Sequence, residues 1–214
     1  MKVAIFNLQL FGVNCYVVYD PDEKKAALID PGIIDGREVE AVDNFLKKNE
    51  LQLVAIINTH LHIDHAIANS ALAARYGVPV MAHPDDEFLG TRMAEQAREF
   101  GLPIKVNSTV IDHPLSDGEI IKIGSGELKV IHVPGHSPGG IALYDAKDGF
   151  LISGDTLFEG SIGRSDLPGG NLARLLESVK KKLYTLPDNT VVYPGHGNPT
   201  TIEREKKSNP YVRG

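Results

Sequence analysis

Three histidines and one aspartate lie within six residues, in the segment His60-Leu61-His62-Ile63-Asp64-His65. Neutral imidazole and carboxylate are side chains that bind zinc, iron and manganese in proteins. The histidines could also stabilise a loop without metal, and Asp64 could cap a following helix. We interpret the segment as a metal-binding element, which requires further ligands from elsewhere in the chain.

The apolar run Leu53–Ile57 comes directly before this segment, and the turn-forming Asn58 separates the two. A short apolar run bounded in this way predicts a buried strand. In open α/β sheets, ligands bind just beyond the carboxyl ends of strands. We therefore expect the histidine cluster at the end of a strand.

Three more residues of the same chemical kinds occupy equivalent positions. His136, Asp155 and His196 each follow an apolar run and have a glycine before them. The runs are Val130–Val133, Phe150–Ile152 and Val191–Tyr193. Alone, each residue could belong to a structural turn. Four strand ends could instead meet at one site, where glycine lets the backbone approach a ligand closely.

The remaining sequence predicts strands in two groups, with helices between them. The predicted strands are Lys2–Leu8, Asn14–Asp20, Lys25–Asp30, 53–57, Val78–His83, Gly118–Ile123, Gly126–Val133, Gly140–Tyr144, Phe150–Ser153 and Thr190–Tyr193. The predicted helices are Gly36–Asn49, His65–Tyr76, Asp85–Phe100, Leu172–Leu183 and Thr200–Lys207. This order favours one domain over residues 1–214, with two sheets face to face and helices outside.

The composition is that of an ordinary soluble globular protein, with 42% hydrophobic and 23% charged residues. The net charge of −6 argues against binding to nucleic acid or an anionic membrane. Cys15 is the only cysteine, so an intramolecular disulfide is impossible and we expect a buried thiol. We find no signal peptide or membrane span and expect a cytoplasmic protein. The sequence leaves the oligomeric state open.

The seven candidate ligands together resemble the H-x-H-x-D-H…H…D…H pattern of the metallo-β-lactamase-fold superfamily. They are His60, His62, Asp64, His65, His136, Asp155 and His196. The similarity extends from Asp30-Pro31-Gly32 to Asn209-Pro210. Residues 154–158 and 163–170 look like those of the small glyoxalase II-like hydrolases, or hydroxyacylglutathione hydrolases. The resemblance implies an α/β (α+β) fold, a four-layer αββα sandwich of two mixed sheets flanked by helices.

Seven ligands exceed what one four-coordinate site can use, which favours two divalent metal ions, zinc or alternatively iron or manganese. The resemblance implies how the ligands divide. His60, His62 and His136 would hold one ion, Asp64, His65 and His196 the other, and Asp155 would bridge them. The resemblance also makes Asp64 and Asp155 candidate catalytic residues.

The resemblance implies hydrolysis by a metal-bound hydroxide, with a small-molecule thioester such as S-lactoylglutathione as the expected substrate. This chemistry needs no serine or cysteine nucleophile. Full-length glyoxalase II has an additional carboxyl-terminal helical domain that binds glutathione. The chain ends soon after Tyr211, so glutathione specificity does not transfer directly. Arg164 could bind a substrate carboxylate, but the adjacent Asp166 favours a structural role.

Two other functions remain open. The first is a mononuclear iron enzyme resembling the persulfide dioxygenases, with His60, His136 and Asp155 as its ligands; those relatives usually have phenylalanine-glutamine where this chain has Leu167-Pro168. The second is a non-catalytic metal-binding module on the same fold. We interpret three other histidines as packing or surface residues: His83, His113 and His132.

Overall fold

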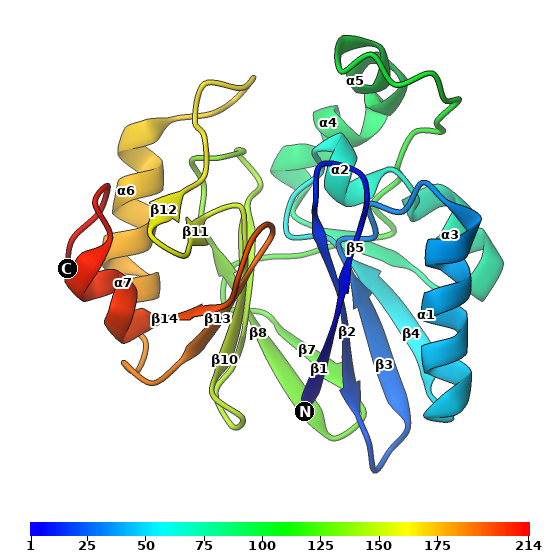
Figure 1. The fold of residues 1–214 in the computed structure, drawn as a ribbon, viewed down its shortest axis with the longest axis horizontal. Coiled ribbons are helices and arrows are strands. Elements are labelled where there is room, and N and C mark those ends of the chain that lie inside the picture. Colours follow the sequence, from blue (N-terminus) through cyan, green and yellow to red (C-terminus); the bar gives the residue numbers. More distant parts are fainter.

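The computed structural model describes residues 1–214 and contains two six-stranded sheets that face each other (Figure 1). The first has the order β1-β2-β3-β4-β5-β6, and the second β14-β13-β10-β9-β8-β7. Strands β3 to β6 run parallel to one another, and β10 runs parallel to β13; the other neighbouring pairs are antiparallel. Both sheets are therefore mixed, as predicted.

The strands of the first sheet are β1 (Lys2–Asn7), β2 (Asn14–Asp20), β3 (Lys25–Ile29), β4 (Gln52–Ile57), β5 (Val80–Ala82) and β6 (His113–Pro114). Those of the second are β7 (Ile120–Ile123), β8 (Gly126–His132), β9 (Ile141–Asp145), β10 (Phe150–Gly154), β13 (Val191–Pro194) and β14 (Thr200–Thr201). A separate two-stranded hairpin consists of β11 (Leu157–Phe158) and β12 (Ser161–Ile162).

The main core lies between the two sheets. Ile29 and Ile57 of the first sheet belong to the same buried cluster as Leu128 and Ile152 of the second. Strand β8 alternates in the way this packing requires, because Leu128 is buried whereas the neighbouring Lys129 is exposed. The pleat of each strand thus directs one row of apolar side chains into the space between the sheets.

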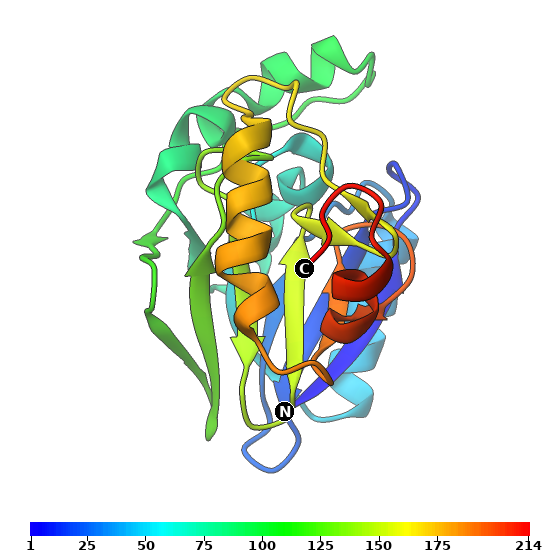
Figure 2. The same ribbon diagram turned by 90° about the vertical axis from the view of Figure 1, so that its left-hand side faces the viewer.

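Helices cover the outer faces and complete the four layers. Helices α1 (Gly36–Lys48) and α3 (Asn69–Tyr76) lie against the first sheet, where Val42 and Leu72 share a core cluster with strand residues. Helices α6 (Leu172–Lys181) and α7 (Ile202–Ser208) cover the second sheet (Figure 2). The predicted four-layer αββα sandwich is confirmed. No helix is long and apolar enough to cross a membrane.

The prediction of one continuous helix over residues 65–76 is wrong. Two helices occupy this region, α2 (Ile63–Ala66) and α3. The backbone N–H of Ala68 donates to the Pro31 carbonyl at 3.3 Å and so leaves the helical pattern. The helix is interrupted because this turn is tied to a strand-end loop of the first sheet.

The predicted helix over residues 85–100 is also divided. It consists of a 3₁₀ turn (Pro84–Asp86), α4 (Glu87–Thr91) and α5 (Met93–Glu99). The Gly90 carbonyl accepts from the Thr109 N–H at 2.9 Å instead of continuing the helix. Strands β6, β11, β12 and β14 were not predicted, since two residues are too few to show an alternating pattern.

Candidate metal centre

Four strand-end loops place the seven candidate ligands at one end of the two sheets. The segment after β4 carries four of them, two in the loop and two in α2, and the loops after β8, β10 and β13 carry His136, Asp155 and His196. Strands β10 and β13 are adjacent and parallel, with Gly154 opposite Pro194, so Asp155 and His196 emerge close together. The first sheet therefore contributes one half of the site and the second sheet the other.

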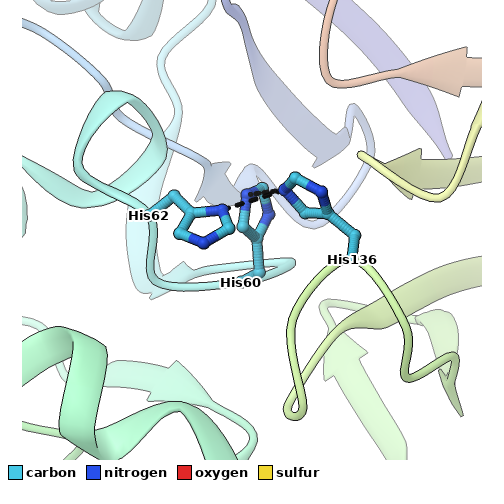
Figure 3. A group of neighbouring side chains, drawn as sticks. All are labelled: His60, His62 and His136. Atoms are coloured by element: carbon cyan, nitrogen blue, oxygen red, sulfur yellow. Dashed lines mark hydrogen bonds between the residues drawn. The ribbon is translucent and has the colours of Figure 1, made fainter. Parts of the chain in front are cut away.

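Three imidazoles form the first cluster, and their ring nitrogens converge (Figure 3). Nε2 of His136 lies 2.9 Å from Nδ1 of His62 and 3.2 Å from Nε2 of His60. Nδ1 of His136 donates to the Arg164 carbonyl at 2.7 Å, so Nε2 carries the lone pair. Nδ1 of His62 and Nε2 of His60 both lie against that lone pair. This crowding of donor atoms suits a cation better than it suits mutual hydrogen bonding.

Asp64, His65 and His196 form the second cluster. Nε2 of His196 lies 3.3 Å from both Nε2 of His65 and Oδ2 of Asp64. Nε2 of His65 is 3.7 Å from the same Asp64 oxygen. One carboxylate and two imidazoles thus direct one atom each into a common space.

Asp155 lies between the clusters and contacts both. Its Oδ1 is 3.4 Å from Nε2 of His65, and its Oδ2 is 3.6 Å from Nε2 of both His136 and His196. Oδ1 is buried and has no hydrogen-bond partner. A buried carboxylate oxygen without a partner is costly unless a cation is present. The seven side chains therefore fit a pair of metal ions, with Asp155 placed to contact each.

Asp30 orients two of the histidines, a role that was not predicted from the sequence. Its carboxylate accepts from Nδ1 of His65 at 3.1 Å and from the Thr59 hydroxyl at 2.6 Å. The Thr59 oxygen in turn lies 3.1 Å from Nδ1 of His60. With both Nδ1 protons engaged, the Nε2 atoms of His60 and His65 face the site. The visible signal was an aspartate at the end of a predicted strand, to which we assigned no role in the site.

The two clusters differ in their electrostatics. Burial lowers the pKa of His60, and lowers that of His62 to about 3, so both imidazoles are neutral at pH 7. Burial also lowers the pKa of His65, but the carboxylates of Asp64, Asp155 and Asp30 raise it by more, to about 10. A metal ion entering the second cluster must displace that proton, whereas the first cluster offers free lone pairs.

Two buried polar residues hold the histidine loop from outside, and neither was predicted. Asp86 accepts from the Leu61 N–H, the Ser137 hydroxyl and the Gly139 N–H, at 3.2, 2.8 and 2.6 Å. Gln96 accepts from the Ile63 N–H at 3.1 Å. Asp86 therefore links the loop that carries His60 and His62 to the loop that carries His136.

Glycines provide the space that the ligands occupy. A Cβ on Gly195 would lie 2.0 Å from Oδ1 of Asp155 and 2.7 Å from Cε1 of His65. A Cβ on Gly32 would lie 1.6 Å from the Asp64 carbonyl oxygen. The glycine beside His196 thus allows two ligands from other loops to approach, which is the function expected of glycine at these strand ends.

A hollow of about 430 Å³ opens onto the clusters. Its lining residues are Phe11, His62, Asp64, Phe100, His136, Asp155, Phe158, Arg164, Leu167 and His196. None of these is a serine, threonine, cysteine or lysine, so its polar groups are the candidate ligands and Arg164. A hollow of about 440 Å³, lined partly by Ile120, Tyr144 and Leu186, contains none of the seven ligands.

Arg164 lines the pocket through its side chain and supports His136 through its backbone. Nε and Nη2 of Arg164 donate to the two carboxylate oxygens of Asp166, each at 2.8 Å. The local partner that favoured a structural role is therefore present. Binding of substrate by Arg164 stays a prediction, and it would require this exposed pair to open.

The remaining histidines occupy the surface or pack against each other. His113 is exposed beside Glu119. His83 and His132 stack with ring centroids 4.0 Å apart and an interplanar angle of 8°. Asp85 lies near both rings. Because the rings are stacked, however, the lone pairs of their nitrogens lie in two parallel planes and do not point toward a common metal position. The predicted packing role fits this geometry, and Cys15 is fully buried as expected.

Comparison with known proteins identifies similar chains. A family model described as "Metallo-beta-lactamase superfamily" matches residues 8–196. The chain is 36% identical to a protein named hydroxyacylglutathione hydrolase GloC from Haemophilus influenzae, over 99% of this chain and 98% of that protein.

Two solved structures also resemble the whole chain. One, titled BLEG-1 B3 metallo-beta-lactamase, has a TM-score of 0.89, 37% identity and full coverage of both chains. The other, titled TTHA1623 in a di-iron-bound form, has a TM-score of 0.84 and 35% identity, covering 99% of this chain and all of that one.

Proposed function

The chain belongs to the metallo-β-lactamase superfamily, and we propose that it is a binuclear metal-dependent hydrolase of a small-molecule thioester such as a hydroxyacylglutathione. The observation that carries this proposal is the convergence of seven imidazole and carboxylate side chains at the base of one pocket. The proposal rests on this chemistry, and the name of the Haemophilus influenzae relative supports a thioester as the substrate.

The first cluster would hold one divalent ion and the second cluster the other, with Asp155 in contact with both. Such a pair of ions lowers the pKa of water and polarises a carbonyl, which supplies the nucleophile and the electrophile for hydrolysis. The tautomers of His60, His65 and His136 are set in advance by their Nδ1 partners, so the ligand atoms need little reorganisation.

The chain's own groups also limit how the reaction can proceed. The pocket offers no side-chain nucleophile of the serine, threonine, cysteine or lysine kind, so attack by water fits it better than covalent catalysis. Asp64 and Asp155 are the only acidic residues that line the pocket. Their oxygens are therefore the nearest carboxylate acceptors for a proton released from water. A thiolate leaves without strong acid assistance, which suits a pocket whose only acidic residues are also candidate metal ligands.

The test is a substrate panel on the metal-loaded protein, with metal identified by elemental analysis. The panel contains S-lactoylglutathione, a lactone, a β-lactam and glutathione persulfide with oxygen uptake recorded. We expect release of free thiol from the thioester, loss of activity after chelation and recovery after addition of metal. A His60→Ala variant should be inactive, whereas His113→Ala removes an exposed histidine and should be fully active. Full activity of His60→Ala, or oxygen uptake without thiol release, would refute the proposal.

A further inference from the structure

Two phenylalanines that line the pocket are about half exposed to solvent. We infer that Phe11 and Phe100 form a binding subsite for an apolar group of the substrate, best filled by an aromatic ring. This inference rests on the proposed thioester hydrolysis and adds a substrate class. The class is thioesters that carry an uncharged apolar group on the acyl side or on sulfur.

The two rings come from segments far apart in the sequence. Phe11 lies in the loop between β1 and β2, and Phe100 directly follows α5; both segments lie at the same end of the molecule (Figure 1). Their centroids are 5.5 Å apart with an interplanar angle of 57°. Phe11 is 51% exposed and Phe100 44% exposed. Binding of an apolar ligand over a water-exposed aromatic pair is favourable because it removes apolar surface from water.

The backbone at Phe11 holds the ring in a specific orientation. Phe11 has φ of 51° and Gly12 has φ of 68°, both in the left-handed region. A phenylalanine in this region is uncommon and costs conformational energy, and such residues concentrate at functional sites. The Leu8 N–H donates to the Val13 carbonyl at 2.9 Å and closes the loop around it. The loop therefore presents the ring to the pocket instead of folding it into the core.

The apolar character continues deeper into the pocket. Phe158 and Leu167 also line it, and the Phe158 ring lies 6.3 Å from the ring of His196. Every other lining residue is a candidate metal ligand or Arg164. A substrate whose carbonyl reaches the clusters would therefore place its remaining atoms against these apolar side chains.

The charges in the pocket do not match those of glutathione. Glutathione carries two carboxylates at neutral pH, and a bound carboxylate is best paired with a cation. Arg164 is the only lining residue with a permanent positive charge, and its Nε and Nη2 already donate to Asp166. An apolar group therefore finds more complementary surface here than a charged carrier does.

Binding is tested with two thioethers that cannot be hydrolysed, S-benzylglutathione and S-methylglutathione. They differ only in the group that we assign to the aromatic wall. Calorimetric titration of the metal-loaded protein should give a Kd at least about fivefold lower for the benzyl compound, the scale of one aromatic contact. In Phe11→Ala and in Phe100→Ala the two compounds should bind equally.

The control is Tyr211→Ala, which removes a 63% exposed aromatic ring that does not line the pocket. It should keep the full benzyl preference. Phe11→Leu retains an apolar side chain and should keep part of it. Equal binding of the two thioethers by the unchanged protein, or a benzyl preference that survives both alanine variants, overturns the subsite.

Turnover separates this inference from the proposed function. With acetyl thioesters of benzyl mercaptan and of glutathione, we expect a KM at least about fivefold lower for the benzyl compound, and loss of that difference in Phe11→Ala. If neither thioester is hydrolysed but the benzyl thioether binds more tightly, the proposed function fails and the subsite stands. If both are hydrolysed with equal KM and both thioethers bind equally, the subsite fails and the proposed function stands.

Discussion

Oδ2 of Asp30 lies 3.1 Å from Nδ1 of His65, and both side chains are fully buried. The hydrogen bond fixes the imidazole tautomer and directs Nε2 toward Asp64 and His196. Asp30 itself has φ of 50°, an uncommon conformation for aspartate that the surrounding contacts maintain. Asp30, which is not itself a candidate metal ligand, thus sets the orientation of His65, which is one.

Asp30→Asn should therefore weaken metal binding while the chain stays folded. The amide would present an N–H to Nδ1 of His65 or to the Thr59 hydroxyl, both of which now donate to Asp30. We expect metal affinity to fall about 10–100-fold, the usual cost of losing such a partner. Competition with a chelator measures it. Asp43→Asn removes a carboxylate that pairs with Arg75 on the surface and should leave the affinity unchanged.

Gly195→Ala should lower metal content through steric conflict alone. Its φ is not positive, so the added methyl group brings no backbone strain, but it would overlap Oδ1 of Asp155. We expect loss of at least one bound ion per chain, measured by elemental analysis of the purified protein. Gly36→Ala is the matched control because nothing lies within 4 Å of its added Cβ. Full metal content in Gly195→Ala would show that Asp155 can move without cost.

Asp86→Ala should destabilise the protein and displace His136. The substitution leaves the Leu61 N–H, the Gly139 N–H and the Ser137 hydroxyl without an acceptor in a buried position. Each unpaired buried donor costs about 1–3 kcal/mol, and partial relaxation should limit the total to about 2–4 kcal/mol. Urea denaturation measures the free energy of unfolding. An unchanged midpoint would mean that water replaces the carboxylate.

If only the protonation of His62 and His65 is considered, the metal-free protein should be most stable near pH 6.5. The pKa of His62 is about 3 in the folded chain, below its ordinary 6.5, so the unfolded chain binds more protons between these values and stability rises with pH. The pKa of His65 is about 10, so the folded chain binds more protons above 6.5 and stability falls as pH rises. Urea denaturation from pH 4 to 9 should show both limbs. His65→Ala should weaken the alkaline limb, to which the raised pKa of His196 also contributes, and His62→Ala should weaken the acidic limb, to which the lowered pKa of His60 also contributes.

Asp166→Ala should change substrate preference without changing metal content. Removing this carboxylate frees the Arg164 guanidinium, while the Arg164 backbone carbonyl still accepts from Nδ1 of His136. We expect KM for a glutathione thioester to fall about three- to tenfold, consistent with a charge-assisted hydrogen bond at an exposed site. Glu159→Ala frees Arg204, which does not line the pocket, and should have no effect. An unchanged KM in Asp166→Ala would assign Arg164 a structural role only.

The sequence by itself determined the architecture and the set of seven candidate ligands. Both depend on local patterns: an apolar run followed by a turn and a ligand-type residue predicts where a strand ends and what emerges there. Histidines His60 and His62 could be assigned to a site from their spacing and surroundings alone. The interruptions at Ala68 and at Gly90 could not be predicted, since each comes from a hydrogen bond to a remote loop.

Only the tertiary structure decided which atoms of these side chains meet and which residues orient them. From the sequence, Asp30 was only the end of a predicted strand and Asp86 only part of a predicted helix, because their partners lie 35 and 51 residues away in His65 and Ser137. Phe11 and Phe100 became a pair only when two distant loops were brought to the same pocket. Strand ends are specified by short-range patterns, whereas the orientation of a ligand depends on buried contacts that the packing of the two sheets creates.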